Sequence, residues 1–540
     1  MPRSKVVCGV TLLCALFIII IIIVVVIIAA RPKCPQGAFS HAAVAADSRT
    51  CSEIGREALR AGGSAVDGAI AALLCTSVVN PQSMGLGGGV IFTVMSSSGQ
   101  VRVINSRETA PRNFQADLLD SCPKSFRMMP GSQWIGVPGE IRGYAEAHRL
   151  YGKLPWPDLF WPTIQLAREG LAISEVLGRY LSYLNVNIST ALHPVIFLLL
   201  CRTLFSDDGG NLLKTGDILK FEKLADTLEV IANEGPDVFY TGQIAEDLIR
   251  DVQEAGGTLT AQDLAAYRAT VTDAWRVPLG EYQMYTPPPP TGGILLSYHL
   301  NSSALEGEQK TLTYHHYVEA FKFANGLKKY TRDPKVQVGF ADHIRSLIKN
   351  NMTHDTEYYS ITPYLDNIGT THVSVLAEDG SAVSVTSTIN QIFGSLVFSP
   401  RTGVILNNQL SDFCGRVENI SPGERPPSFV APSLIKSQLS TLVIGSAGGS
   451  TITTGLALMN HLWFGKSLEE AIAEPVVFVD SSAKLTFERK FDQKVIDGLT
   501  ALGHQQGKVR LFNVVNAVEK VGDCIWAVSD ARKLGQAAGY

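Results

Sequence analysis

The sequence predicts an α+β protein with a large antiparallel sheet. Three features indicate this fold class: helical patterns dominate the early part of the chain, alternating strand patterns with hairpin turns follow Thr370, and no internal repeat is visible. The 540 residues are 46% hydrophobic and 18% charged, which suits a large core and excludes disorder. The formal charge of -4 gives no basic excess, so we expect no nucleic-acid partner.

An apolar run at residues 6–30 comes first. At about 1.5 Å per residue it is longer than the roughly 30 Å hydrocarbon core of a bilayer. A cleaved signal peptide is the alternative, but its apolar core usually spans only about 7–15 residues. We therefore expect a single-pass type II membrane anchor at 6–30, with a cytoplasmic tail at 1–5 and the remaining chain on the other side.

Sequons and cysteines favour an extracellular ectodomain at the plasma membrane. Potential glycosylation sequons begin at Asn187, Asn301, Asn351 and Asn419, the last weakened by Pro422. Two of the nine cysteines lie in the anchor, and the odd number outside it leaves at least one unpaired. No C-x-x-C pair supports a zinc or thioredoxin-like site, so we expect at least one disulfide.

The first elements of the ectodomain are two helices within residues 41–80. Ser52 is a candidate N-cap of the first helix, which ends at a Gly-Gly pair. Ser64 and Asp67 have the spacing of a capping box that opens the second helix. Residues 89–105 predict a hairpin around a Ser/Gly turn.

The middle of the chain, residues 140–330, is predicted to be mostly helical and interrupted by the prolines at 287–290. Residues 340–369 are polar and poorly periodic, so they predict a loop or linker. Alternating patterns then resume at 371–378 and 381–388 around an Asp-Gly turn, a strong hairpin signal.

The last part of the chain predicts further β structure and one helix. A second hairpin turns at 399–403, with its second strand at 404–406, and a short strand at 442–444 runs into Gly448 and Gly449. A helix is expected from about residue 451, and two more β segments near 483–488 and 524–529.

Several common motifs are missing. No G-x-S-x-G or H-E-x-x-H occurs, and the glycines at 85–89 precede a strand rather than a helix, unlike a dinucleotide-binding loop. His316 and Glu319 have helical spacing, but no third metal ligand is evident. These stretches therefore favour neither a metal site at His316 and Glu319 nor a dinucleotide-binding loop at 85–89.

The stretch that begins at Gly369 and Thr370 carries the most informative chemistry. A cut before Thr370 would leave this residue with a hydroxyl and a free α-amine, whose pKa of about 7.7–8.0 suits it to accept the hydroxyl proton. The same hydroxyl could make that cut by attacking the carbonyl of Gly369, which has no side chain to shield it. A plain strand threonine is the alternative interpretation.

The predicted hairpin strengthens the functional interpretation. A two-residue turn at Asp379 and Gly380 puts Thr370 opposite residue 389, and one extra bulge residue puts it opposite Thr388. Thr388 could then bond the Thr370 hydroxyl, with Asn390 nearby. Gly448 and Gly449, at a strand-to-helix junction, could supply backbone N–H groups for an oxyanion hole, although a tight turn explains them equally well.

These motifs together resemble the γ-glutamyltransferases. The resemblance rests on Thr370-Thr-His, on the strand that ends at Asn390, on Asn407-Asn408 and on the glycine-rich 445–449. The stretches 84–89 and 103–108 fit as well, and the likeness extends from about residue 40 to the end. The stretches 75–92 and 133–140 are most similar to one vertebrate branch of the family, whose members hydrolyse glutathione and leukotriene C4.

The resemblance implies an N-terminal-nucleophile hydrolase with a four-layer αββα sandwich and no cofactor. The precursor would cut itself between Gly369 and Thr370, and the large chain, 1–369, would stay paired with the small chain, 370–540. Thr370 would take the γ-glutamyl group from glutathione or a glutathione conjugate. Water, an amino acid or a dipeptide would then receive it.

The resemblance also implies roles for individual residues. Thr370 matches the nucleophile, Thr388 its hydrogen-bonding partner, and Gly448 and Gly449 the oxyanion hole. Arg107 matches the residue that pairs with the donor's α-carboxylate, for which a forked guanidinium is well suited. Further matches are the substrate contacts Asn390, Asp412 and Ser428 and the disulfide partners Cys51 and Cys75. The second disulfide of the family finds only Cys201.

The chain departs from the family pattern at three places. Gln409 stands where a glutamate usually contacts the donor's α-ammonium, and loss of that charge could weaken binding about 10–150-fold. Phe429 replaces the second serine of a pair, and residues 340–369 and 413–441 look short. A pseudoenzyme of the same fold is therefore one alternative. A related acylase with non-glutamyl donors and, more distantly, a metal-dependent peptidase are the others.

Overall fold

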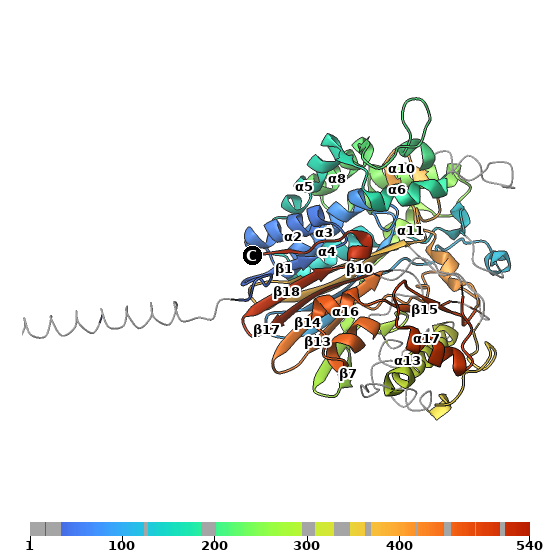
Figure 1. Cartoon of the computed structure of the whole chain (residues 1–540). Helices are drawn as coiled ribbons and strands as arrows, with labels where there is room; N and C mark the ends of the chain where they lie inside the picture. Colours follow the sequence, from blue (N-terminus) through green and yellow to red (C-terminus); the bar gives the residue numbers. More distant parts are fainter. Residues whose placement is uncertain are drawn as a thin grey trace, which may run out of the picture.

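Two antiparallel sheets stacked face to face form the centre of the molecule, and helices cover both outer faces (Figure 1). The computed structural model describes residues 17, 34–123, 128–184, 201–293, 308–328, 346–361, 369–416, 419–447, 455–480, 482–507 and 514–540. Within these residues, no helix combines the length and apolar character needed to cross a bilayer. The predicted anchor at 6–30 lies, apart from Phe17, outside them.

The first sheet holds the predicted nucleophile. All of its neighbouring strands pair antiparallel. In sheet order the strands are β19 (Ala538–Gly539), β1 (Ala43–Ala45), β9 (Gly369–Leu376), β10 (Ala382–Asn390), β2 (Gly89–Met95), β3 (Val101–Ser106) and β6 (Thr270–Asp273).

The second sheet lies against the first and is also antiparallel throughout. Its strands are, in order, β18 (Cys524–Ser529), β17 (Val514–Val521), β14 (Ser440–Ala447), β13 (Ser433–Lys436), β8 (Tyr282–Thr286) and β7 (Trp275–Leu279). Small hairpins and bridges lie outside both sheets: β4 (Leu171–Ala172) with β5 (Ile218–Leu219), β11 (Phe398–Ser399) with β12 (Val404–Ile405), and β15 (Val477–Val479) with β16 (Leu485–Phe487).

The space between the sheets is partly polar. Ser374 donates a hydrogen bond to the Asn516 carbonyl (3.0 Å), and Ser384 donates one to the Ile444 carbonyl (2.9 Å). The His372 ring packs directly against Gly445, where a Cβ atom would lie 2.2 Å from the ring. These contacts join β9 and β10 to the second sheet through hydrogen bonds as well as through apolar packing.

The hairpin of β9 and β10 has the register that the site needs. Thr370 lies opposite Thr388, as the one-residue correction to a two-residue turn predicted. The extra residue sits in the turn itself, because Ala377 N–H bonds the Ser381 carbonyl around three loop residues that end in Gly380 at φ +80°. A register shift follows between Thr388 and Asn390.

Helices α2 (Arg49–Arg60) and α3 (Ala65–Val79) cover the outer face of the first sheet. The capping box of Ser64 and Asp67 is present. The N-cap prediction for Ser52 is wrong, because the helix begins three residues earlier and the Ser52 hydroxyl accepts a bond from Ala46 N–H.

Other helices complete the two outer layers. On the side of α2 lie α4 (Glu140–Tyr151), α5 (Trp161–Glu169), α6 (Glu175–Leu181), α8 (Glu222–Glu234), α9 (Val238–Thr241), α10 (Gln243–Glu254) and α11 (Ala261–Ala266). On the side of the second sheet lie α13 (Glu308–Leu327), α15 (Gly455–Leu458) with the π-helix Met459–Trp463, α16 (Leu468–Ala473) and α17 (Gln493–Ala501).

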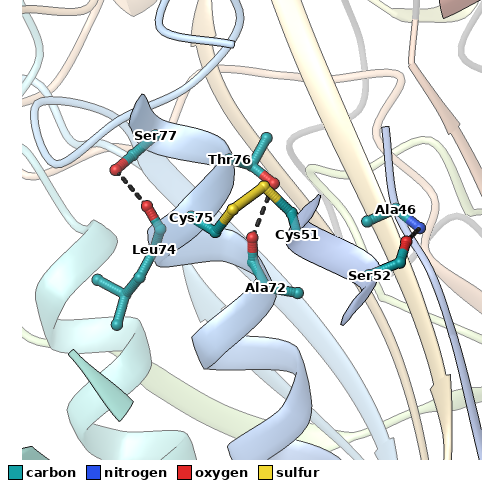
Figure 2. The surroundings of a disulfide bond; sticks show 8 residues. All are labelled: Ala46, Cys51, Ser52, Ala72, Leu74, Cys75, Thr76 and Ser77. Atoms are coloured by element: carbon teal, nitrogen blue, oxygen red, sulfur yellow. Dashed lines mark hydrogen bonds between the residues drawn. A yellow bond between two sulfur atoms is a disulfide. The ribbon is translucent and has the colours of Figure 1, made fainter. Parts of the chain in front are cut away.

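Three disulfides join described cysteines, so the expectation of at least one is confirmed. They are Cys34–Cys524, Cys51–Cys75 and Cys122–Cys414, and Cys201 is a buried free thiol. Figure 2 shows that Cys51–Cys75 ties the first turn of α2 to the last part of α3. The other two connect residues more than 290 positions apart.

Candidate active site

The Thr370 hydroxyl lies buried at the start of β9, in contact with Thr388. The two Oγ1 atoms are 3.1 Å apart, and Thr388 Oγ1 donates to the Gly369 carbonyl at 2.6 Å. Asn390 N–H donates to Thr388 Oγ1 at 2.8 Å. Because the single Thr388 proton is used on the carbonyl, Thr370 must be the donor in the threonine pair. The hydrogen bonds therefore share one direction: Thr370 donates to Thr388, and Thr388 donates to the carbonyl of Gly369.

Gly369 is required here by packing as well as by chemistry. A Cβ atom at this position would lie 2.5 Å from the Gln391 carbonyl oxygen and 2.9 Å from that of Asn390. Both are backbone atoms at the end of the neighbouring strand β10, and backbone atoms cannot move aside as a side chain would. The glycine therefore lets the two backbones approach while it leaves its own carbonyl open to Thr370.

A buried ion pair fixes the other side of Thr370. Lys533 Nζ donates to the Thr370 carbonyl (2.6 Å) and pairs with Asp47 (2.8 Å). Asp47 also accepts from the Thr371 hydroxyl (2.7 Å) and from Asn516 Nδ2 (2.8 Å). Residues from both ends of the chain thus hold Thr370 in its position at the start of β9.

Arg107 and Asp412 form a buried ion pair beside the threonines' sheet. Arg107 Nη2 lies 2.5 Å from Asp412 Oδ2, and Gln409 Nε2 donates to the same oxygen at 2.7 Å. Lys328 Nζ bonds Asp412 Oδ1 at 3.0 Å and lies 4.8 Å from the centre of the Phe429 ring. Burial alone would raise the pKa of Asp412, but the Lys328 and Arg107 cations hold it below its usual value. The carboxylate is therefore ionised.

Asn390 connects the threonine pair to this cluster. Its backbone N–H donates a hydrogen bond to Thr388 Oγ1. Its side-chain Nδ2 donates to the Asn408 carbonyl (3.0 Å) and to Ser411 Oγ (2.8 Å). Asn390 Oδ1 and Gln409 Oε1 are buried acceptors that find no hydrogen-bond donor among the described residues. These two unused acceptors, one of them on the residue whose N–H bonds Thr388, are suited to a ligand with N–H groups.

Ser428 does not reach Arg107 directly. Its hydroxyl accepts from Val430 N–H at 3.1 Å, whereas the carbonyls of Pro426 and Pro427 accept from the Arg107 guanidinium at 2.8 and 3.1 Å. The backbone of the segment after Arg425 therefore fixes the position of the Arg107 guanidinium group.

Two further buried carboxyls lie near this cluster: Glu108, which follows Arg107 in the chain, and Glu140, which lies within electrostatic reach of Glu108. Burial raises the pKa of Glu108 to about 8 despite the nearby Arg107, and burial raises that of Glu140 to about 8 although Tyr144 donates to it at 2.6 Å. Both carboxyls are therefore protonated at neutral pH.

His372, two residues after Thr370, is a structural residue. Burial lowers its pKa to about 3, so the ring is neutral, and it bonds Thr386 and Ser374 at 2.8 and 3.0 Å. The ring lies on the same face of β9 as the Thr370 side chain and packs into the space between the sheets, while Thr370 Oγ1 bonds Thr388.

The structure separates His316 and Glu319, whose helical spacing the sequence analysis noted. His316 bonds Asn350 on the surface, while Glu319 faces His315 and His504 in the interior. Lys322 donates to Glu319 Oε1 (3.2 Å) and to His504 Nδ1 (3.0 Å), so an ammonium group occupies the centre of this cluster. The arrangement is a buried ion pair with imidazole partners.

Several predicted site residues lie outside the described residues: Gly448, Gly449, Asn187 and Asn301. Asn351 is exposed, as a glycan acceptor requires. Lys328, Lys533 and Asp47 were not foreseen. No spacing in the sequence relates them to Thr370 or Arg107, since they reach the site from distant segments.

Comparisons with known proteins agree with this geometry. A family model described as Gamma-glutamyltranspeptidase matches residues 51–540. The Rattus norvegicus protein named Glutathione hydrolase 5 proenzyme is 45% identical over 99% of this chain and 98% of its own length. The Homo sapiens protein of that name is 46% identical over 94% of each chain. Among solved structures, cephalosporin acylase from Bacillus halodurans has a TM-score of 0.83 at 21% identity, covering 95% of this chain and 98% of its own, a likeness of fold alone.

Two stacked antiparallel sheets between helical layers, with a threonine hydroxyl at the start of an inner strand, form the fold of the N-terminal-nucleophile hydrolases. The predicted four-layer fold is confirmed. The chain belongs to the gamma-glutamyltranspeptidase family, and its similarity to the type-five glutathione hydrolases confirms the vertebrate branch that the sequence indicated.

Proposed function

We propose that this chain cuts itself between Gly369 and Thr370, and that the new N-terminal threonine then cleaves the γ-glutamyl bond of glutathione and of glutathione S-conjugates such as leukotriene C4. One observation supports the proposal most directly: the chain of hydrogen bonds from the Thr370 hydroxyl through the Thr388 hydroxyl to the Gly369 carbonyl. The series brings the nucleophile, a donor for the developing oxyanion and the bond to be cut into contact.

Self-cleavage follows from these contacts. Thr370 Oγ1 attacks the Gly369 carbonyl carbon while Thr388 donates to the carbonyl oxygen. The carbon–nitrogen bond breaks, the nitrogen takes the proton, and an ester links Gly369 to the Thr370 side chain. One water molecule hydrolyses this ester, which leaves a carboxylate on Gly369 and a free amine and hydroxyl on Thr370.

The mature site would use the freed amine as its base. The α-amine takes the hydroxyl proton as Thr370 Oγ1 attacks the donor's γ-carbonyl carbon. The resulting α-ammonium gives this proton to the leaving nitrogen, the carbon–nitrogen bond breaks, and a γ-glutamyl ester remains on Thr370. Water, an amino acid or a dipeptide then receives the acyl group. Gly448 and Gly449 are assigned to the oxyanion hole by family resemblance.

The ion-pair cluster beside the threonines would bind the donor's head group. Arg107 is assigned to the α-carboxylate because its guanidinium is buried and held in place by backbone carbonyls. The other residues assigned to head-group binding are Asn390, Gln409, Asp412 and Ser428. The amide of Gln409 is compatible with this role, since its Oε1 is buried without a donor among the described residues.

The same proposal divides the chain and places it in the cell. A tail at 1–5, a membrane anchor at 6–30 and an ectodomain at 31–369 would form the large chain, and 370–540 the small chain. The two would remain a heterodimer at the plasma membrane with the ectodomain outside. Glycans are assigned to Asn187, Asn301 and Asn351.

Intact-mass measurement and N-terminal sequencing of the purified, deglycosylated protein test this proposal. We expect a small chain that starts at Thr370, and a single uncut, inactive chain from Thr370→Ala. Thr371→Ser, which keeps the hydroxyl on Asp47, is the matched control and should still be cut. A wild-type chain that stays uncut would refute the proposal and favour a family member that kept the fold without the activity.

A further inference from the structure

We infer that one end of the two-sheet core, formed by the turns of the β13–β14 and β17–β18 hairpins, docks on the surface of the bilayer that holds the proposed anchor. Lys436 and Lys520 bind phosphate groups of the phospholipids there. Leu439 and Val521 enter the layer of headgroups. The inference goes beyond the cleavage of γ-glutamyl bonds, and it rests on the membrane anchor in the proposed function.

A hollow of about 350 Å³ lies at this end of the core. The first sheet contributes its β2–β3 turn and parts of the β9–β10 hairpin, and the second sheet contributes residues 436–441 and 520–522. Hydroxyl groups and ammonium groups are hydrogen-bond donors that suit an anion with several oxygen atoms. The hydroxyl-bearing residues of the lining are Ser96, Ser97, Ser98, Ser437, Ser440 and Thr441.

Two lysines of the second sheet line the same hollow. Lys436 lies opposite Thr441, and Thr441 lies opposite Lys520, so the three side chains form a row on one face of the sheet. A Cβ atom on Gly99 would lie 3.5 Å from Lys436 Nζ, which places this ammonium group at the β2–β3 turn. Neither lysine forms an ion pair with a carboxylate among the residues that the structure describes. Both ammonium groups can therefore bind an anion.

The acidic side chains of the neighbouring turns do not neutralise these lysines. Glu378 bonds His41 at 2.8 Å, and Asp379 pairs with Lys153 at 2.9 Å. Asp523 is exposed and does not line the hollow. The charged side chains of the lining are thus both positive, which is the complement of a phosphate group.

Two apolar side chains project from the turns beside the hollow. Leu439 is 80% exposed and Val521 is 42% exposed. The two turns touch, because Gly522 N–H donates to the Leu439 carbonyl at 3.5 Å. Apolar side chains next to basic ones suit a membrane interface, where phosphate groups lie directly above hydrocarbon.

The Cys34–Cys524 bond determines which end of the core faces the bilayer. Cys524 begins β18, directly after the turn that holds Val521 and Gly522. Residue 34 follows the proposed anchor at 6–30 by four positions. Four residues span at most about 14 Å even when fully extended, so the turns must lie close to the headgroups. Helices α13 and α17 lie on the other side of the molecule from the labelled β17 and β18 (Figure 1).

Acylation of lysines in the full chain tests the inference. The protein is placed in nanodiscs of phosphatidylcholine and, separately, in micelles of an uncharged maltoside detergent that contains no phosphate. A water-soluble amine-acylating reagent is added, and mass spectrometry gives the modification rate of each lysine. We expect Lys436 and Lys520 to react about fivefold more slowly in the nanodiscs. Lys494, exposed on α17, is the control and should react equally in both. Equal rates for Lys436 and Lys520 in the two settings overturn the inference.

A double variant tests the two apolar side chains. Leu439→Ser combined with Val521→Ser changes only exposed residues, so the protein should fold and cleave γ-glutamyl p-nitroanilide with the wild-type kcat/KM. The acylation rates of Lys436 and Lys520 in nanodiscs should rise to their values in micelles. Met352→Ser, at a residue that is 45% exposed, is the matched control and should leave both lysines protected. Protection that persists in the double variant overturns the inference.

The remaining outcomes separate the sources of phosphate and the two proposals. Protection by inorganic phosphate in micelles, with none by the nanodiscs, would make the hollow a site for a free anion and refute docking. A chain that does not stay with the lipid during nanodisc purification would refute the anchor and the docking together. An enzyme that stays with the lipid and cleaves the γ-glutamyl anilide, but whose two lysines are not protected, would keep the proposed function and refute the docking alone.

Discussion

The hydroxyl of Thr388 makes three hydrogen bonds, and together they fix the direction of its proton. It accepts from Asn390 N–H and from Thr370, and it donates to the Gly369 carbonyl. A residue of equal size without the hydroxyl should therefore remove the donor to the developing oxyanion while it keeps the packing.

We accordingly expect Thr388→Val to slow self-cleavage by about 10²–10³-fold, the usual cost of one lost oxyanion donor. The measurement is the rate at which purified precursor converts to two chains. Thr388→Ser should cleave at close to the wild-type rate because it keeps the hydroxyl. Rapid conversion of the valine variant would remove Thr388 from the mechanism.

At the scale of residues, the sequence could place Thr370 opposite Thr388 because both lie in one hairpin, where register is counted from a recognisable turn. It could not place Lys328 or Lys533. Lys328 meets Asp412 across 84 positions, and Lys533 meets Thr370 across 163. Contacts across such separations depend on how whole elements pack, which no local pattern encodes.

At the scale of elements, the start of β9 is held against the backbone that follows β10. Gly369→Ala should displace this start because the added Cβ meets the Gln391 carbonyl oxygen at 2.5 Å. We expect self-cleavage at least tenfold slower, measured by the precursor conversion rate. Gly85→Ala is the control, since a Cβ there meets no atom within 4 Å, and it should convert normally.

The ion pair of Lys533 and Asp47 connects the 3-10 helix Ala531–Lys533 to the ends of β1 and β9. Both side chains are nearly buried, so removal of one partner leaves an uncompensated charge. We expect Lys533→Met to lower the free energy of unfolding by about 3–5 kcal/mol in urea titrations. The double variant with Asp47→Asn should lose less than the sum of the two single variants, and strict additivity would contradict the coupling.

The β9–β10 hairpin was predicted because Asp379-Gly380 lies between two alternating runs. The extra residue was predicted too, and the structure places it in the turn. Strands β6 to β8 were missed: the segment 270–286 was included in the mostly helical prediction, although it forms the edge strands β6 and β7 and the adjoining strand β8, whose side chains are mostly exposed or half-buried. Half-exposed edge strands have weak alternation, so their pattern gives little warning.

At the scale of the whole molecule, buried protonated carboxyls make stability depend on pH. The folded pKa of Glu140 is about 8 against an ordinary 4.5, so its stabilising contribution is complete below pH 4.5 and lost as the pH rises through 8. In the uncut Thr370→Ala background, Glu140→Gln should therefore make the fall in stability between pH 5 and 8 shallower, by about 1.4 kcal/mol per pH unit.

Urea unfolding at several pH values between 5 and 8 would measure this slope. Glu146→Gln, on the same helix, is the control. The hydrogen bond from Arg149 holds the pKa of Glu146 below its usual value, so its contribution is already constant in this range. An unchanged slope in Glu140→Gln would contradict the protonated state of that carboxyl.

Two disulfides cross the proposed cut, whereas Cys51–Cys75 lies within the large chain. We expect the processed enzyme to migrate as one species without reductant and as two chains with it. Cys34→Ser combined with Cys414→Ser should release the small chain without reductant, and Cys51→Ser should not. Two free chains from the unreduced wild-type protein would contradict these pairings.

The fold class followed from the order of helices and hairpins, but the stacking of the two sheets did not. The first sheet places β19 beside β1 and β1 beside β9, strands from the two ends and the middle of the chain. The face of the first sheet that packs on the second sheet is also less apolar than the usual interior face of a sheet. Ser374, Ser384 and His372 point from it toward the second sheet. Burial of such residues depends on partners from the second sheet.

The Cys34–Cys524 bond also has a mechanical meaning. Tension on the proposed membrane anchor at 6–30 would reach residue 34 and pass directly through the sulfur atoms into β18. From there it spreads over the second sheet through β17 and β14. This load path would bypass the bond between Gly369 and Thr370, so the proposed anchor would pull on the proposed small chain without pulling on the N-terminus that the proposed cut creates.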